Sequence, residues 1–271
     1  TAAWLQSSAQ RPDEASAETA RLRQATLTKP PGSLGRLEEI AVRLAGMQRA
    51  RRPSIERVCV TVFAADHGVA AEGVSAFPQS VTAEMVRNFA RGGGAINVLA
   101  RALGATLEIV DVGTAIDPGP LAGVVSRRIA SGTANFCRAP AMTEDQLVAA
   151  LDAGRVAAER AHAASAQLFI CGEMGIANTT AASALACAVL GLAPAAVAGP
   201  GTGLDARGIA KKAQVVEAAL SRHRPLMGEP VAPLTALRCV GGFEIAALVG
   251  AFARCAQLGI PVLVDGFISS A

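Results

Sequence analysis

Hydrophobic positions along this chain follow two different periods, which predict helices and strands in turn. Residues 13–27 and 37–48 carry apolar side chains at helical spacing. The segment 29–35 between them holds two prolines and two glycines, which end a helix and form a turn. Residues 57–65 are instead a nearly continuous apolar run rich in β-branched side chains. Such a run is typical of a parallel strand covered on both faces.

The rest of the chain repeats this order of strand and helix. Further strands are predicted over 106–110, 124–129, 167–171 and 260–264, and helices over 81–91, 95–103, 143–164, 180–190, 206–223 and 245–258. The alternation predicts an α/β fold with a doubly wound, mostly parallel, Rossmann-like sheet. The first two helices precede every strand. We therefore expect a small helical subdomain over 1–50 and a Rossmann-like α/β domain over 51–271.

Composition narrows the class of protein. The chain has 271 residues, of which 51% are hydrophobic and 3% aromatic, and a formal net charge of +3. So small a charge and so few aromatic side chains argue against a nucleic-acid partner. No apolar run reaches the ~20 uncharged residues that a membrane helix needs, so we expect no membrane partner. The six cysteines form no CxxC pair and the three histidines lie far apart. We therefore expect reduced cysteines, a cytoplasmic location and no metal.

Polar side chains follow the predicted strands directly. Asp66 and His67 follow the first strand, Asp111 the second and Asp265 the last. The carboxyl ends of parallel strands meet at one edge of the sheet, where α/β folds place their sites. For Asp66 and Asp111, the simpler interpretation is a helix cap or a turn acceptor. For His67, a satisfied polar residue beside a loop is at least as favoured as a general base.

The stretch Cys171–Thr180 carries the strongest chemical signal. It runs from a strand through Gly172 and Gly175 into a helix of small residues, an order that aims backbone N–H groups at an anion. Its one carboxylate, Glu173, is better suited to accept hydrogen bonds from ribose hydroxyls or a heterocycle N–H. We expect this loop to be exposed at the sheet edge. A strand-to-helix turn with an ordinary cap explains the short motif equally well. Together, the residues predict a domain that binds a small anionic ligand such as a nucleotide.

An ordered set of short motifs resembles one enzyme family. The motifs are Lys29–Glu38, Ala65–Val69, Pro78-Gln79 with Val81-Thr82, Asn97–Ala100, Asp111–Gly113, Gly172–Ile176 with Asn178–Thr180, Gly241–Glu244 and Pro261–Phe267. In this order, from Lys29 to the last residue, they resemble the nicotinate-nucleotide–dimethylbenzimidazole phosphoribosyltransferases of the cobalamin lower-ligand pathway. Any one motif is weak, whereas the ordered set is specific.

The resemblance implies a reaction between two small molecules. The phosphoribosyl group of nicotinate mononucleotide moves to 5,6-dimethylbenzimidazole, which yields α-ribazole 5′-phosphate and nicotinate. It implies a homodimer and no cofactor. The apolar stripe of the N-terminal helix pair is compatible with an isologous contact. A catalytically silent nucleotide-binding module on the same fold stays open as the alternative. A nucleotide hydrolase built on Asp66 and His67 is a weaker third possibility.

The resemblance also assigns site residues by position. Those for the ribose and its phosphate are Glu173, Gly175, Ile176, Asn178, Thr179 and Thr180, with Lys212 and Ser269 near the phosphate. Those for the benzimidazole pocket are Phe77, Pro78 and Met85. Taken alone, Lys212 would more simply be a solvated lysine on a helix face, and Phe77 and Met85 plain packing residues. Asp66, His67 and Asp265 remain further candidates at the edge of the site.

Two features depart from the family's pattern. Ala177 stands where we expect a glycine. The family's proton-accepting glutamate lies in a Gly-Glu-Gly run well downstream of the Asp265–Phe267 motif, and this sequence has no such run. The sequence also stops five residues after Gly266, whereas a strand of this kind should lead into another helix. We therefore expect this chain to be part of a longer protein, with the general-base glutamate C-terminal to Ala271, and the catalytic residue stays unknown.

Overall fold

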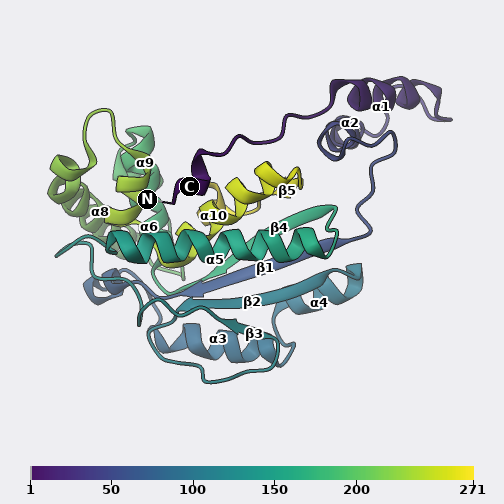
Figure 1. Cartoon of the computed structure of the whole chain (residues 1–271). Coiled ribbons are helices and arrows are strands. Elements are labelled where there is room, and N and C mark those ends of the chain that lie inside the picture. The colour runs from purple at the N-terminus through teal and green to yellow at the C-terminus, as the bar shows by residue number, and fades with distance from the viewer. Residues whose placement is uncertain (1) are drawn as a thin grey trace.

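A computed structural model describes residues 2–271 and contains a five-stranded sheet flanked by helices (Figure 1). The strands are β1 (Val58–Ala65), β2 (Thr106–Gly113), β3 (Val124–Ser126), β4 (Leu168–Met174) and β5 (Val262–Leu263). Every paired neighbour runs parallel, in the order β3-β2-β1-β4-β5. The predicted α/β class and parallel sheet are confirmed.

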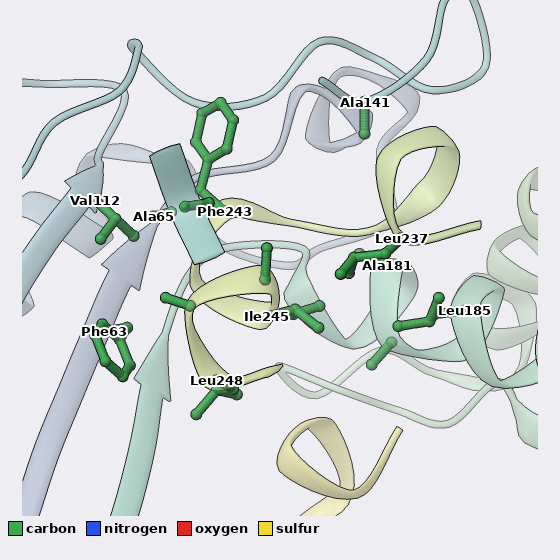
Figure 2. Close-up of a cluster of buried hydrophobic side chains, with 14 of the residues drawn as sticks. Phe63, Ala65, Val112, Ala141, Ala181, Leu185, Leu237, Phe243, Ile245 and Leu248 are labelled. Atoms are coloured by element: carbon green, nitrogen blue, oxygen red, sulfur yellow. The ribbon is translucent and has the colours of Figure 1, made fainter. Parts of the chain in front are cut away.

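Helices cover both faces of the sheet. The helices α3 (Ser80–Ala90) and α4 (Ala95–Leu103) lie on one face, and α5 (Glu144–Ala163) and α10 (Phe243–Leu258) lie on the other (Figure 1). Alternate side chains of β1 point to opposite faces and so divide the core. Val62 and Ala64 belong to a small cluster with Val86 and Phe89 of α3. Phe63 and Ala65 belong to the larger cluster that includes Ile245 and Leu248 of α10 (Figure 2).

The helices α5 and α10 pack at very short range because each presents a glycine to the other. A β-carbon on Gly154 would lie 2.7 Å from the backbone nitrogen of Ala251, and one on Gly250 would lie 2.8 Å from the carbonyl carbon of Leu151. No side chain fits between the two backbones. This contact holds α10 in place over the sheet, with its first turn at the carboxyl ends of the central strands.

A second group of helices lies beyond those carboxyl ends. It comprises α6 (Asn178–Leu190), α7 (Pro194–Val197), α8 (Ala206–Met227) and α9 (Pro233–Val240), while α11 (Phe267–Ser270) packs against α6 and β4. Figure 1 shows α6, α8 and α9 gathered at one end of the sheet. The sequence did not predict α9. Its eight residues make little more than two turns, too few for a helical period to be read.

The N-terminal helices α1 (Glu14–Thr26) and α2 (Arg36–Gln48) pack on one another and stand apart from the sheet in Figure 1. The short 3-10 helix η1 (Ala3–Gln6) lies against the α/β body instead. Trp4 Nε1 donates to Asp152 of α5 at 2.9 Å, and the Gln257 side chain of α10 donates to the Trp4 carbonyl at 2.9 Å. The helical hairpin is therefore shorter than the segment 1–50. Within residues 2–271, no helix has both the length and the apolar character needed to cross a bilayer.

Candidate active site

The strand order creates a crevice between β1 and β4. The chain starts at β1, moves outward through β2 and β3, and then returns to the other side of β1 with β4 and β5. Connections leave β1 and β4 in opposite directions, and α/β folds bind ligands outside the carboxyl ends of such a strand pair. Asp66 and His67 directly follow β1, and Glu173 pairs with Phe63 near the end of β4.

Asp66 is buried and holds three loops together. Its Oδ1 accepts a hydrogen bond from Thr82 Oγ1 at 2.6 Å, and its Oδ2 accepts one from the Ala115 backbone at 2.8 Å. The Thr82 hydroxyl also accepts the Ile176 N–H at 3.1 Å, which ties α3 to the loop after β4. Burial raises the pKa of Asp66, and these hydrogen bonds oppose the rise. Its geometry fits the turn-acceptor interpretation.

Asp111 has the same kind of role at the end of β2. Its Oδ1 accepts the backbone N–H groups of Gly113 at 3.0 Å and Thr114 at 2.9 Å. Its Oδ2 lies 3.1 Å from Arg128 Nη1. The carboxylate therefore closes the turn after β2, with a cation as its partner.

His67 forms an ion pair that the sequence did not predict. Its Nε2 lies 2.7 Å from Glu244 Oε1, and both side chains are 0% exposed. Glu244 belongs to the first turn of α10. The preceding residue, Phe243, packs so tightly on the end of β2 that a β-carbon on Gly113 would lie 2.6 Å from its ring. Figure 2 shows Phe243 beside Ala65 and Val112. The available signal was a single carboxylate at the start of the mostly apolar helix 245–258.

Neighbouring negative charges raise the pKa of the His67 imidazole above its ordinary value. Burial alone lowers the pKa of His67. The negative charges of Glu244 and Asp66 and the hydrogen bond to Glu244 outweigh burial, so the pKa of His67 is raised. The buried imidazole thus lies among acidic side chains that favour its protonated form.

Glu173 is a carboxylate poised to change its charge near neutral pH. Burial is the larger cause, and the negative charge of Glu244 adds to it, so that the pKa of Glu173 is raised to about 7. His67 and a hydrogen bond from Asn178 Nδ2 act in the opposite direction. An ordinary glutamate would be fully ionised at this pH.

The loop after β4 is buried, so the expectation of an exposed loop is wrong. Gly175, Ile176 and Ala177 are all buried. A β-carbon on Gly175 would collide with the carbonyl oxygen of Ala65 and would lie 3.4 Å from His67 Nε2. The reason is that β1 and the residues after it lie directly against the loop. Glycine is therefore required here by the protein's own backbone, apart from any ligand.

Ala177 makes the turn into α6 in a left-handed conformation. Its φ is 74° and its ψ is 7°, and it stands at the N-cap of the helix. This region favours glycine, because a β-carbon crowds the following carbonyl. The glycine expected from the family pattern has a physical basis in this backbone.

A set of polar donors gathers where α6 begins. Lys212 of α8 is 0% exposed, and its Nζ donates to Thr179 Oγ1 at 3.1 Å and to the Gly199 carbonyl at 3.0 Å. A β-carbon on Gly201 would lie 2.7 Å from Lys212 Nζ, so the loop after α7 wraps closely around the ammonium. Burial lowers the pKa of Lys212. The interpretation as a solvated lysine is wrong, because this cation is buried at the N-terminus of a helix, where anions bind.

The loop before α3 is tied to the same place. Thr202 Oγ1 accepts the Ala76 backbone N–H at 3.0 Å and lies 3.1 Å from Ser75 Oγ. Phe77, which follows, is 53% exposed, and Pro78 is exposed too. These two residues therefore sit on a loop anchored beside the Lys212 region.

The remaining predicted residues differ in their burial. Met85 is half-buried and packs with Met174 against the cluster under α3, so α3 and β4 share an apolar surface there. Asn178 and Thr180 are buried, and Ser269 is half-buried on α11, which contacts α6 and β4. Asp265 is exposed after β5. The structure thus brings Ser269 toward the helix that carries Asn178–Thr180, and leaves Asp265 at the surface.

The general base expected beyond Ala271 stays a prediction. Ala271 is exposed and directly follows α11, the short helix that contacts α6 and β4. The last turn of the described chain therefore lies beside the helix that begins with Asn178–Thr180. Glu173 is half-buried and Glu244 is buried in this region, and neither is assigned the role of that base.

Two hollows open at the surface of the described residues. One of about 770 Å³ is lined by residues 126–129 and α5, and another of about 870 Å³ is lined mainly by α8 and the segment 187–194. Neither contains Glu173 or Lys212, so the site is identified by its contacts and charges. Within residues 2–271, no three His, Cys, Asp or Glu side chains are grouped as a metal site.

A buried cation at a helix N-terminus, beside a carboxylate at the crevice of a parallel sheet, is typical of α/β proteins that bind phosphorylated small molecules. A family model described as "Phosphoribosyltransferase" matches residues 9–271. The chain belongs to this phosphoribosyltransferase family, and it is therefore a transferase. The resemblance drawn from the motifs is confirmed.

Relatives and solved structures agree with this assignment. The nicotinate-nucleotide–dimethylbenzimidazole phosphoribosyltransferase of Pseudomonas putida strain KT2440 is 57% identical over 270 residues, covering 100% of this chain and 76% of the relative. The enzyme of the same name from Xanthomonas euvesicatoria pv. vesicatoria is 58% identical over 268 residues, covering 99% of this chain and 76% of the relative. The crystal structure of CobT from Thermus thermophilus is similar with a TM-score of 0.89 and 46% identity, covering 94% of this chain and 76% of that one.

Proposed function

We propose that this chain transfers the phosphoribosyl group of nicotinate mononucleotide to 5,6-dimethylbenzimidazole, giving α-ribazole 5′-phosphate and nicotinate in cobalamin nucleotide-loop assembly. The names of relatives 57% and 58% identical over nearly the whole chain support this reaction. The structural observation that carries it is the buried Lys212 ammonium beside Thr179 at the start of α6. It supplies a fixed positive charge for a phosphate.

The reaction needs three features that this crevice can supply. Lys212 and Thr179, at the start of α6, bind the phosphate, and Glu173 accepts hydrogen bonds from the ribose hydroxyls. The apolar surface of Met85, with Phe77 and Pro78 at its rim, accommodates the flat benzimidazole. Ser269, on α11, stands near the phosphate.

The bond changes balance without a cofactor. The bond between C1′ and the nicotinate nitrogen breaks, and its electron pair stays on nicotinate. The benzimidazole nitrogen with a free lone pair forms the new bond to C1′ from the opposite face, so a β linkage becomes α. The proton on the other ring nitrogen passes to a general base, the role that the family resemblance gives to a glutamate. Holding both substrates in one crevice converts a bimolecular step into an intramolecular one.

The experiment measures nicotinate release from nicotinate mononucleotide with and without the benzimidazole, with the Pseudomonas putida relative as positive control. Release that requires the benzimidazole supports transfer. Release without it would indicate hydrolysis instead. Nucleotide binding without any release would indicate the catalytically silent module.

The chain offers a matched pair of lysines for the phosphate assignment. Lys212 is buried, whereas its neighbour Lys211 is exposed. We expect Lys212→Met to weaken binding of nicotinate mononucleotide by about 100-fold, since a charge-assisted bond contributes about 1.5–3 kcal/mol. Lys211→Met should bind like the parent. Calorimetric titration measures both, and equal affinities would contradict the placement of the phosphate.

We further propose that the protein is a homodimer in the cytoplasm. Exposed leucines on α1 and α2, including Leu22 at 62% and Leu37 at 64%, support a contact with a second copy.

The six cysteines are free thiols, four of them buried, which is compatible with a reducing compartment such as the cytoplasm. Recovery of the protein in the periplasmic fraction of its source cells would contradict the location.

A further inference from the structure

The buried pair His67–Glu244 has polar atoms that make no hydrogen bond within the described residues. Both carboxylate oxygens of Asp66 accept hydrogen bonds, one from Thr82 of α3 and one from Ala115 in the loop after β2. In contrast, His67 Nδ1 and Glu244 Oε2 are buried without a hydrogen-bond partner within residues 2–271. Since the desolvation of a buried ion pair offsets much of its attraction, the pair alone is weak evidence of a stabilising role.

The pair lies directly against the loop that carries Glu173. His67 Nε2 would be 3.4 Å from a β-carbon on Gly175, two residues after Glu173. On the other side, a β-carbon on Gly242 would collide with the imidazole and lie 2.6 Å from Glu244 Oε2. The imidazole is therefore held between two glycine segments, and any shift of it would displace the Glu173 loop.

Charged groups from two elements act on the Glu173 carboxylate. Glu244 comes from α10, and His67 follows β1; their effects on Glu173 are opposite in sign, and that of Glu244 is the larger. From α6 the polar Asn178 side chain donates to Glu173. Asp66 acts on His67 and so belongs to the same coupled group.

We propose that His67 and Glu244 are positioning residues for Glu173, because the buried pair supports its loop and determines whether it meets the nucleotide as a carboxylate or as a neutral acid. The nucleotide part of this inference rests on the proposed function. The pair acts on the nucleotide through Glu173.

The test follows the ionisation of Glu173 without any ligand. The side-chain carboxyl carbons of glutamate are labelled with ¹³C, and the Glu173 signal is assigned by its loss in Glu173→Gln. The parent signal should titrate at about 7. His67→Gln removes the positive charge and should move the midpoint up by about half a unit or more. Glu244→Gln removes the stronger, negative influence and should move it down.

A double variant guards against a purely structural explanation. His67→Gln with Glu244→Gln keeps an amide hydrogen bond without charge, and its midpoint should fall between those of the single variants. Midpoints that stay at the parent value in every folded variant would overturn the proposal. Failure of all three variants to fold, judged by thermal melts, would mark the pair as structural and would overturn it as well.

Nucleotide binding separates this inference from the proposed function. Calorimetric titrations with nicotinate mononucleotide between about pH 5 and pH 9 should show an affinity change whose midpoint moves with the carboxyl midpoint in each variant. Glu173→Gln should lack that component and retain only the change caused by the nucleotide's own phosphate. If the parent does not bind the nucleotide, the proposed function fails, while the carboxyl titration still decides the role of the pair.

Discussion

Ala177 adopts a backbone conformation that alanine seldom takes, and it does so at the start of the helix nearest the proposed phosphate. Its φ of 74° disfavours any side chain, by about 1–2 kcal/mol. Replacing it with glycine relieves this strain but removes a buried methyl group and adds freedom to the unfolded chain. We expect Ala177→Gly to change the free energy of unfolding by less than about 1 kcal/mol.

Ala181, also buried on α6, is the matched control because its backbone is helical. Ala181→Gly should lower the free energy of unfolding by about 2 kcal/mol, because glycine has a lower helix propensity and buries less apolar surface. Chemical denaturation compares the two variants. Equal losses would mean that the Ala177 backbone is not strained.

The charge of Glu173 predicts a dependence of stability on pH. Its pKa is about 7 in the fold, above the ordinary 4.5. Between these values the folded chain binds more protons than the unfolded chain, so this residue's contribution to stability is lost as the pH rises from the lower value to the higher. Glu173→Gln removes this loss. The free energy of unfolding of this variant should exceed that of the parent by about 1–3 kcal/mol near pH 8 and equal it near pH 4.

Denaturation at both pH values measures the effect. Glu39→Gln, at an exposed glutamate of α2, is the control and should show nearly the same small difference at each pH. A Glu173→Gln variant that is less stable than the parent near pH 8 would show that the carboxylate is favourable in the fold.

The sequence predicted where some site residues lie, though not how they pair. Asp66 and His67 follow β1, and Glu173 lies near the end of β4, so their convergence could be predicted from the strand pattern alone. The partner of His67 could not be predicted in this way, because Glu244 is 177 positions away in the chain. That pairing depends on how far α10 reaches over the sheet, which is decided by the packing of glycines against backbone.

At the scale of elements, the contact between α5 and α10 is the most sensitive point of the fold. A β-carbon on Gly250 has no room against the backbone of Leu151. Alanine favours helices, but its β-carbon would force α5 and α10 apart, and this cost should outweigh the gain. We expect Gly250→Ala to lower the free energy of unfolding by about 2 kcal/mol or more. Thermal melts measure it. Gly199→Ala places its β-carbon in open space and should change stability by less than about 0.5 kcal/mol. Similar melts for both would contradict the close contact.

The elements themselves were predicted best where a long period or a cap was present. The helix α5 begins as expected, with the Thr143 hydroxyl accepting the Gln146 N–H. The edge strands were predicted too long: β3 has three residues and β5 has two. An apolar run indicates that a segment is extended, but a strand is defined by its partner, and each edge strand has only one.

At the scale of the whole molecule, the hairpin of α1 and α2 exposes apolar side chains that a monomer leaves in water. We expect the protein to sediment as a dimer at micromolar concentration. Leu37→Glu should shift it to a monomer, because burying an unpaired carboxylate costs several kcal/mol. Leu103→Glu, on α4 and 74% exposed in one copy, should remain dimeric. A monomeric parent, or a Leu103→Glu variant that dissociates instead, would contradict a contact through the hairpin.

The position of β1 between β2 and β4 has a consequence for the order of folding. The crevice is made by residues after β1, after β4 and at the start of α10, which are widely separated along the chain. Such contacts require long loops to close first, so they form late, and a fragment must reach from β1 to α10 to contain the site. A nucleotide that binds only the folded crevice stabilises all the elements that form it. Amide hydrogen exchange should therefore slow in β1, β4 and α10 together when the nucleotide binds, as one cooperative unit.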